Sequence, residues 1–265
     1  VVTVVIPSYG FLRQKEQPCI GNVSVDFRGR KERVSFFQAR PRREQNNVSH
    51  IIADHPLFGK TGNNKRIYTD DPPDRPFASD ANLYAFFCAS VIHAQHAGLF
   101  IPADVVHLHD WHAAFYLLLQ KYCASYTKLN QVRTVFTIHN LSLQGIRPFA
   151  GDTSSLAAWF PELPLEKLFS RSRDPRYPDC INPMAIGIRL SDRVHTVSPT
   201  YAEEICRRSI DTEKRKFKGG EGLEEDILEA KKEGRLFGIL NGIHYREGPE
   251  SEKTLSLSDL IGILK

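Results

Sequence analysis

The sequence predicts an α/β fold, a doubly wound and mostly parallel sheet with helices on both faces. Short apolar runs recur along the 265 residues, and they alternate too little with polar residues to be half-exposed strands. Nearly continuous runs of this kind are typical of parallel strands buried on both faces. Helical stretches separate the runs, and this strand–helix–strand alternation favours right-handed crossovers within one sheet.

Six apolar runs are predicted as strands, in chain order Val1–Ile6, Val48–Ile52, Asp104–Leu108, Thr134–Ile138, Arg193–Val197 and Leu236–Leu240. Four segments are predicted as helices: Asn82–Ala97, Ala113–Tyr122, Tyr201–Arg208 and Glu221–Glu233. Ser198 is placed to cap the third helix with Pro199 in its first turn, and Gly234 is placed to end the fourth.

The composition excludes several classes of protein. With 41% hydrophobic and 25% charged residues, the chain is near the average of soluble globular proteins, which argues against disorder, collagen and a coiled coil. No apolar run approaches the roughly 20 residues that span a bilayer, so no membrane partner is expected. At about 100–200 residues per domain, the length predicts one large domain or two small ones. The net charge of +4 permits an anionic partner without requiring one.

Cysteine usage and the first residue add two expectations. The five cysteines are scattered and form no C-x-x-C pair, which favours a reducing compartment over a disulfide framework or a zinc ribbon. The chain opens at Val1 inside a strand-like run, so we expect a piece of a longer protein. Two strongly basic segments, Arg28–Arg43 and Arg207–Lys218, are expected to be solvated loops or faces rather than anion-binding sites.

Polar or small residues follow four of the predicted strands. They are His109 to His112, His139-Asn140, Ser198 to Thr200, and Asn241-Gly242. In open parallel sheets, ligands bind beyond the carboxyl ends of the strands, where loops diverge and helix N-termini point. The sequence therefore places Asp110, His139, Ser198 and Asn241 along one edge of the sheet.

The segment HLHDWH allows two interpretations. A zinc hydrolase would use His107, His109 and His112 as ligands, although the metallohydrolase pattern H-x-H-x-D-H differs from it by the early aspartate. Recognition of a polyol suits the segment better, because the Asp110 carboxylate accepts from sugar hydroxyls and the Trp111 indole covers an apolar sugar face. His107 is then expected to be structural.

His139 follows a buried strand and is placed to hydrogen-bond a substrate hydroxyl or carbonyl. The alternative is a bond from this histidine to a neighbouring loop carbonyl. Gln144-Gly145 supplies an amide and a tight turn. There is no G-x-S-x-G elbow, no Walker loop and no dinucleotide fingerprint after a strand, and nothing resembles a nucleic-acid-binding motif, so no nucleic-acid partner is expected.

Five blocks together resemble the amino-terminal domain of bacterial glycogen synthases and plant starch synthases, in the family's order and at its spacings. They are DVVHLHDWHA (104–113), TVFTIHNLSLQG (134–145), DRVHTVSPTYAEEI (192–205), EGLE (221–224) and GRLFGILNGI (234–243). The resemblance implies a GT-B enzyme, with two facing Rossmann-like domains, that transfers glucose from ADP-glucose to an α-1,4-glucan with retention and without a metal or other cofactor. Residues 1–245 would be the amino-terminal catalytic domain, truncated at both ends, and residues 246–265 a linker or the start of an interdomain segment.

The resemblance also implies roles for individual residues. His139 and Asp110 would be catalytic, with His139 bonded to the transferring glucose and Asp110 near the acceptor. The implied substrate-binding residues are Trp111, His112, Asn140, Gln144, Asn241 and Gly242. The partners would be the glucan acceptor, the nucleotide-sugar donor and the carboxyl-terminal donor-binding domain of the same protein, in a bacterial cytoplasm rather than a plastid.

The chain departs from the family pattern in several places. The K-x-G-G-L loop near the donor phosphates and the whole second domain are absent from the sequence. Ala185-Ile186-Gly187 stands where Lys-Ala-Gly is common, and His244 stands where an acidic residue is usual. Three alternatives therefore stay open: a zinc-dependent hydrolase, a non-catalytic glucan-binding module, and UDP-glucose as donor in place of ADP-glucose.

Overall fold

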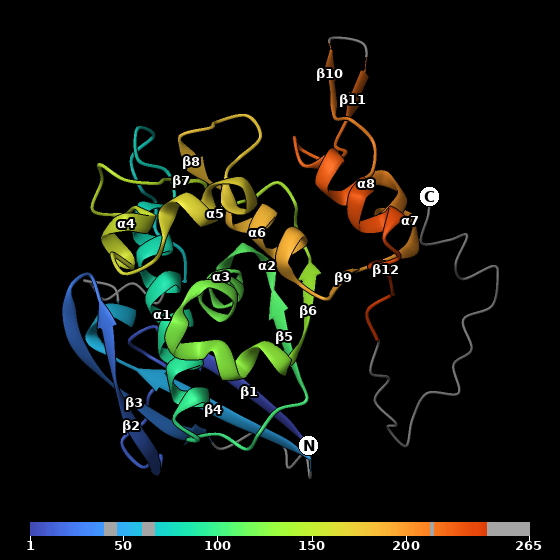
Figure 1. The fold of residues 1–265 in the computed structure, drawn as a ribbon. Helices are drawn as coiled ribbons and strands as arrows, with labels where there is room; N and C mark the ends of the chain where they lie inside the picture. Colours follow the sequence, from blue (N-terminus) through green and yellow to red (C-terminus); the bar gives the residue numbers. More distant parts are fainter. Residues whose placement is uncertain (40–46, 60–66, 213–214, 243–265) are drawn as a thin grey trace, which may run out of the picture.

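The computed structural model describes residues 1–39, 47–59, 67–212 and 215–242 (Figure 1). Two four-stranded sheets form its framework. The first has the order β1-β4-β3-β2, with β1 (Val2–Pro7), β2 (Cys19–Phe27), β3 (Arg30–Ala39) and β4 (Val48–Asp54). The second has the order β12-β9-β6-β5, with β5 (Val105–His109), β6 (Arg133–Ile138), β9 (Arg193–Thr196) and β12 (Leu236–Gly238).

All six predicted strands are confirmed, and so is the α/β class. Every pairing in the second sheet is parallel, as is the pairing of β1 with β4. In the first sheet, β3 pairs antiparallel with both β4 and β2. The strands outside the two sheets form short antiparallel pairs: β7 (Arg147–Pro148) with β8 (Cys180–Ile181), and β10 (Ile210–Thr212) with β11 (Arg215–Phe217). Figure 1 shows the β10–β11 hairpin projecting away from the body of the molecule.

The helices follow the predicted pattern with shifted ends. They are α1 (Ala78–His96), α2 (Asp110–Ala113), α3 (Phe115–Tyr122), α4 (Leu156–Trp159), α5 (Leu165–Ser172), α6 (Pro183–Leu190), α7 (Pro199–Glu204) and α8 (Glu224–Lys232). Short 3-10 helices lie at Pro56–Phe58 and Ala124–Gln131. No helix within the described ranges is long and apolar enough to cross a membrane.

Local chemistry explains two helix ends. The Ser198 hydroxyl accepts from the Tyr201 amide at 2.9 Å with Pro199 in the first turn, which confirms the predicted cap of α7. The predicted fourth helix was to begin at Glu221, but α8 begins at Glu224. Glu221 and Gly222 have φ angles of 49° and 89°, and this left-handed backbone cannot continue a helix.

The prediction of a solvated loop or face at Arg28–Arg43 is confirmed as a solvated face over most of the described part of that segment, which forms a strand rather than a loop. Arg30–Ala39 forms β3, which pairs antiparallel with β2 through Val23 and Val34. The strand alternates, so that Val34 and Phe36 are fully buried while Lys31 and Arg33 face solvent. The basic side chains Lys31 and Arg33 therefore lie on the outer, solvated face of a strand. Arg207–Lys218 is a solvated face as predicted, with its hairpin strands carrying an exposed Asp211–Lys216 ion pair.

The hydrophobic core lies between the sheets and the layer of α1, α3 and α6. Phe136 and Ile138 of β6 and Val194 of β9 are fully buried. Gly187 of α6 sits directly on the Phe136 ring, because a Cβ built at this glycine would overlap the ring atoms. The predicted segment 246–265 and the predicted domain boundary at 245 lie outside the described residues.

This contact yields a prediction about stability. Replacement of Gly187 by Ala adds a methyl group where the Phe136 ring lies, so we expect the free energy of unfolding to fall by about 1–3 kcal/mol. The loss should appear although alanine is the better helix former by about 1 kcal/mol. Urea denaturation measures it, and Gly242→Ala, at a position with open space, is the matched control. Unchanged or higher stability of Gly187→Ala would contradict this packing.

Candidate functional site

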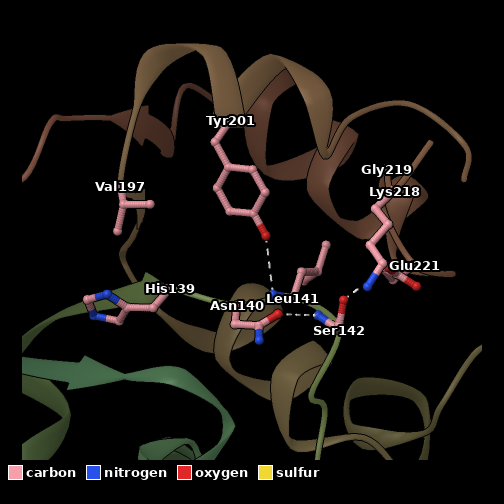
Figure 2. Close-up of a pocket in the computed structure, with 9 residues that line it drawn as sticks. All are labelled: His139, Asn140, Leu141, Ser142, Val197, Tyr201, Lys218, Gly219 and Glu221. Carbon is pink, nitrogen blue, oxygen red and sulfur yellow. Dashed lines mark hydrogen bonds between the residues drawn. The ribbon is translucent and has the colours of Figure 1, made fainter. Parts of the chain in front are cut away.

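A cavity of about 300 Å³ opens beyond the carboxyl ends of β6 and β9 (Figure 2). Its lining residues come from three segments: His139, Asn140, Leu141 and Ser142 after β6; Val197 and Tyr201 after β9; and Lys218, Gly219 and Glu221 before α8. This is the edge of the sheet where the sequence places a ligand. Of the predicted site residues, His139 and Asn140 line the cavity.

The Asp110 side chain, which follows β5, hydrogen-bonds to the backbone that follows β6. One carboxylate oxygen accepts from the backbone amides of His139 at 2.8 Å and of Asn140 at 3.3 Å. Burial raises the pKa of Asp110 above its usual value, although both amides oppose the shift. Its φ of 54° is left-handed, a conformation that costs a residue with a Cβ about 1–2 kcal/mol. Strain of this kind is concentrated at functional sites.

The His139 ring is held by a second histidine. Nε2 of His139 lies 2.9 Å from Nδ1 of His109, so one ring donates and the other accepts. Burial, followed by the repulsion of the neighbouring imidazoles, lowers the pKa of His109 to about 4. His109 is therefore neutral at neutral pH. The predicted alternative, a bond from the His139 ring to a loop carbonyl, is not what the structure records.

Asn140, Leu141 and Tyr201 together form part of the cavity wall. The Asn140 side-chain oxygen accepts from the Ser142 amide at 3.0 Å, which closes a tight turn. The Tyr201 hydroxyl accepts from the Leu141 amide at 3.2 Å, and burial raises the pKa of Tyr201, so the phenol stays protonated. Figure 2 shows both bonds as dashed lines across the cavity wall.

Trp111 and His112 lie outside the cavity lining. The Trp111 ring is 1% exposed and packs against Phe77 and Tyr84, with ring centroids 5.7 and 5.5 Å apart. His112 lies 4.5 Å from the Tyr84 ring, and burial lowers the pKa of His112 to about 4. Their contact with a sugar therefore remains a prediction.

Gln144 is also absent from the cavity lining, and it is 4% exposed. Its side-chain oxygen accepts from Arg176 at 2.6 Å and from Asn182 at 2.7 Å. Its side-chain nitrogen donates to the carbonyls of Leu141 and Glu221, each at 3.1 Å. The Gln144 amide thus joins three segments around the cavity. The sequence did not predict this joining role for Gln144.

Asn241 and Gly242 are exposed at the end of the described chain, after β12. They are not among the lining residues, so their predicted binding role remains a prediction. Ser198 caps α7 from the same edge of the sheet.

The histidines of HLHDWH do not converge on one point. His107 and His109 lie on one face of β5 with ring centroids 4.3 Å apart, whereas His112 packs beside Trp111 and Tyr84. His107 bonds to the Thr137 hydroxyl at 2.6 Å, in agreement with a structural role. Residues 1–39, 47–59, 67–212 and 215–242 contain no group of three side chains arranged to hold a metal ion. The zinc-hydrolase interpretation is not supported.

Sequence reasoning missed four polar lining residues: Ser142, Tyr201, Lys218 and Glu221. Tyr201 and Glu221 stand inside blocks that the resemblance rests on, so block membership was a usable signal for both. Ser142 stands inside the block 134–145 and had the same signal. Lys218 lies outside all five blocks, and its proximity to Ser142 depends on loops about 76 positions apart in the sequence.

Comparisons with known proteins agree with this geometry. The family model described as the starch synthase catalytic domain matches residues 1–229. The chain is 30% identical to glycogen synthase of Natranaerobius thermophilus over 93% of its length and 44% of that protein. It is 33% identical to glycogen synthase of Streptococcus agalactiae serotype III over 91% of its length and 45% of that protein.

A solved structure shows the same fold. The catalytic domain of starch synthase IV from Arabidopsis thaliana, bound to ADP and acarbose, superposes with a TM-score of 0.69 at 24% identity. The match covers 91% of this chain and 44% of that chain. The chain thus spans less than half the length of these relatives. With the family model matching 1–229, the chain belongs to the glycogen and starch synthase family of glycosyltransferases.

Proposed function

We propose that this chain is the acceptor-side half of an enzyme that transfers glucose from ADP-glucose to the non-reducing 4-hydroxyl of an α-1,4-glucan, with retention. The observation that carries the proposal is the cavity beyond β6 and β9, lined by His139 and by hydrogen-bonding groups. Family membership and the ADP and acarbose named for the Arabidopsis structure support it. The second domain would bind most of the nucleotide.

The proposed chemistry of His139 follows from its contacts. Its Nε2 is paired with His109, whereas Nδ1 has no hydrogen-bond partner among the described residues. When His109 donates its Nδ1 proton, Nδ1 of His139 carries a proton and can donate to an oxygen of the transferring glucose. Such a fixed donor stabilises an oxocarbenium-like transition state because it needs no reorganisation during the reaction.

Asp110 would act beside this histidine. One of its oxygens is occupied by the backbone amides of His139 and Asn140. The other oxygen has no hydrogen-bond partner among the described residues, so it can accept from a sugar hydroxyl while the fixed backbone keeps it in place. ADP-glucose rather than UDP-glucose, the bacterial cytoplasm rather than a plastid, and chemistry without a metal all remain predictions from the sequence.

The 265-residue chain by itself should not transfer glucose at a measurable rate. The proposed reaction needs a donor-binding domain, and the chain matches only 44% of the length of its relatives. Incorporation of labelled glucose from ADP-glucose into glycogen measures this, with an intact glycogen synthase as the positive control. A rate comparable to that of the intact enzyme would contradict the division of labour between the two halves.

In the complete protein, His139→Ala should lower kcat roughly 10²–10³-fold and raise the KM for glucan far less. The reason is that the proposed hydrogen bond strengthens only in the transition state. Steady-state kinetics with ADP-glucose and glycogen measure both constants, and His96→Ala, an exposed histidine of α1, is the matched control. An unchanged kcat would refute this role for His139. An inactive wild-type protein that still binds glucan would favour the binding-module alternative.

A further inference from the structure

Glu221 combines three features that the proposed reaction has not used. Its side chain lines the cavity, its carboxylate accepts from the Ser142 hydroxyl at 3.1 Å, and its φ is 49°. A left-handed backbone is unfavourable for any residue with a Cβ, and glycine would adopt it without penalty. The glycines on both sides, Gly220 and Gly222, show that the chain uses glycine freely in this loop. The geometry of the turn alone would favour glycine at this position, so the glutamate side chain is expected to have a role of its own.

The backbone of Glu221 is fixed on both sides. Its amide donates to the Ser209 hydroxyl at 3.1 Å, and its carbonyl accepts from Gln144 at 3.1 Å. Gln144 is itself held by Arg176 and Asn182. The side chain therefore projects from a rigid support, and only one of its two carboxylate oxygens is bonded to Ser142. The other oxygen is left for a ligand among the groups that the structure describes.

The charges around the cavity favour an uncharged ligand. Lys218 and Glu221 contribute one positive and one negative charge to the lining, and the remaining polar groups belong to His139, Asn140, Ser142 and Tyr201. A mixture of donors and acceptors with balanced charge suits a polyhydroxylated molecule better than a phosphate. A volume of about 300 Å³ is at the lower end of small-molecule sites, which favours a single sugar unit.

We infer that Glu221 is a glucan-binding residue, whose carboxylate accepts hydrogen bonds from hydroxyl groups of one glucose unit of the acceptor while Ser142 holds it in orientation. The inference rests on the proposed function and adds a specificity-determining contact to it. A carboxylate that accepts from two neighbouring hydroxyls distinguishes a sugar from an apolar ligand of the same size.

Kinetics of the complete protein with maltotriose as acceptor test the inference. Glu221→Ala should raise the KM for maltotriose roughly 10–100-fold and lower kcat much less. Glu221→Gln, which keeps one acceptor oxygen, should give a smaller rise. Glu225→Gln, in the first turn of α8 and outside the cavity lining, is the matched control and should leave both constants unchanged. The KM for ADP-glucose should stay the same in all three variants.

A comparison of Glu221→Gly with Glu221→Ala separates binding from folding. Glycine relieves the left-handed strain, so Glu221→Gly should unfold at a higher temperature than Glu221→Ala, although both variants lose the same affinity for maltotriose. If Glu221 had only a structural role, Glu221→Gly would regain affinity for maltotriose together with stability, and this result would contradict the inference.

The outcomes distinguish the inference from the function beneath it. If the wild-type protein transfers glucose and the KM for maltotriose is unchanged in Glu221→Ala, the role of Glu221 is overturned and the proposed function stands. A rise confined to the KM for ADP-glucose overturns the assignment to the acceptor. If the complete wild-type protein transfers no glucose to maltotriose or glycogen, the proposed function fails and the inference fails with it.

Discussion

The side-chain amide of Gln144 is the interaction on which the rest of the site depends. Its oxygen and nitrogen reach Arg176, Asn182, Leu141 and the carbonyl of Glu221, so one buried group joins the loop after β6 to two segments later in the chain. A buried amide costs free energy unless its hydrogen bonds are made, and here they are made by the parts of the chain that must meet. The cavity wall is a consequence of this arrangement.

The two residues that supply carboxylates beside the site share an unusual backbone. Asp110 and Glu221 both have positive φ, and both are fixed by hydrogen bonds, Asp110 through its side chain and Glu221 through its backbone and side chain. A strained conformation persists only where surrounding contacts determine it, and it aims a side chain in a direction that a relaxed backbone does not reach. Together with the paired rings of His109 and His139, these contacts hold the polar groups before any ligand arrives. Such preorganisation reduces the cost of ordering them on binding.

Much of the parallel framework was predictable, because buried parallel strands leave nearly continuous apolar runs. Strands β2 and β3 were missed for the converse reason: they alternate, and the basic residues on the outer face of β3 concealed Val34 and Phe36. Helix α6 was missed as well, although Asn182 caps it by accepting from the Ala185 amide and Pro183 stands in its first turn. A helix of eight residues makes only about two turns, so its hydrophobic periodicity is too short to be recognised in the sequence.

The candidate site was predictable only where it lies at a strand end. His139 and Asn140 follow β6 directly, so the rule for open sheets located them. Glu221 and Lys218 reach the same cavity from a loop that is distant in sequence, and only the three-dimensional structure reveals that. Trp111 was predicted to face a sugar, yet Phe77, Tyr84 and Gly145 enclose its ring. An aromatic side chain beside a polar strand end can serve the core as well as a ligand.

The central claim is that the cavity beyond β6 and β9 receives the glucan. Amide chemical-shift mapping by NMR, with maltotriose titrated into the protein, tests it most directly. The account predicts that the perturbed amides fall in the three lining segments, 139–142, 197–201 and 218–221, with little change in the β2–β3 hairpin. Perturbations confined to that hairpin or to another surface, with none at the cavity, would contradict it.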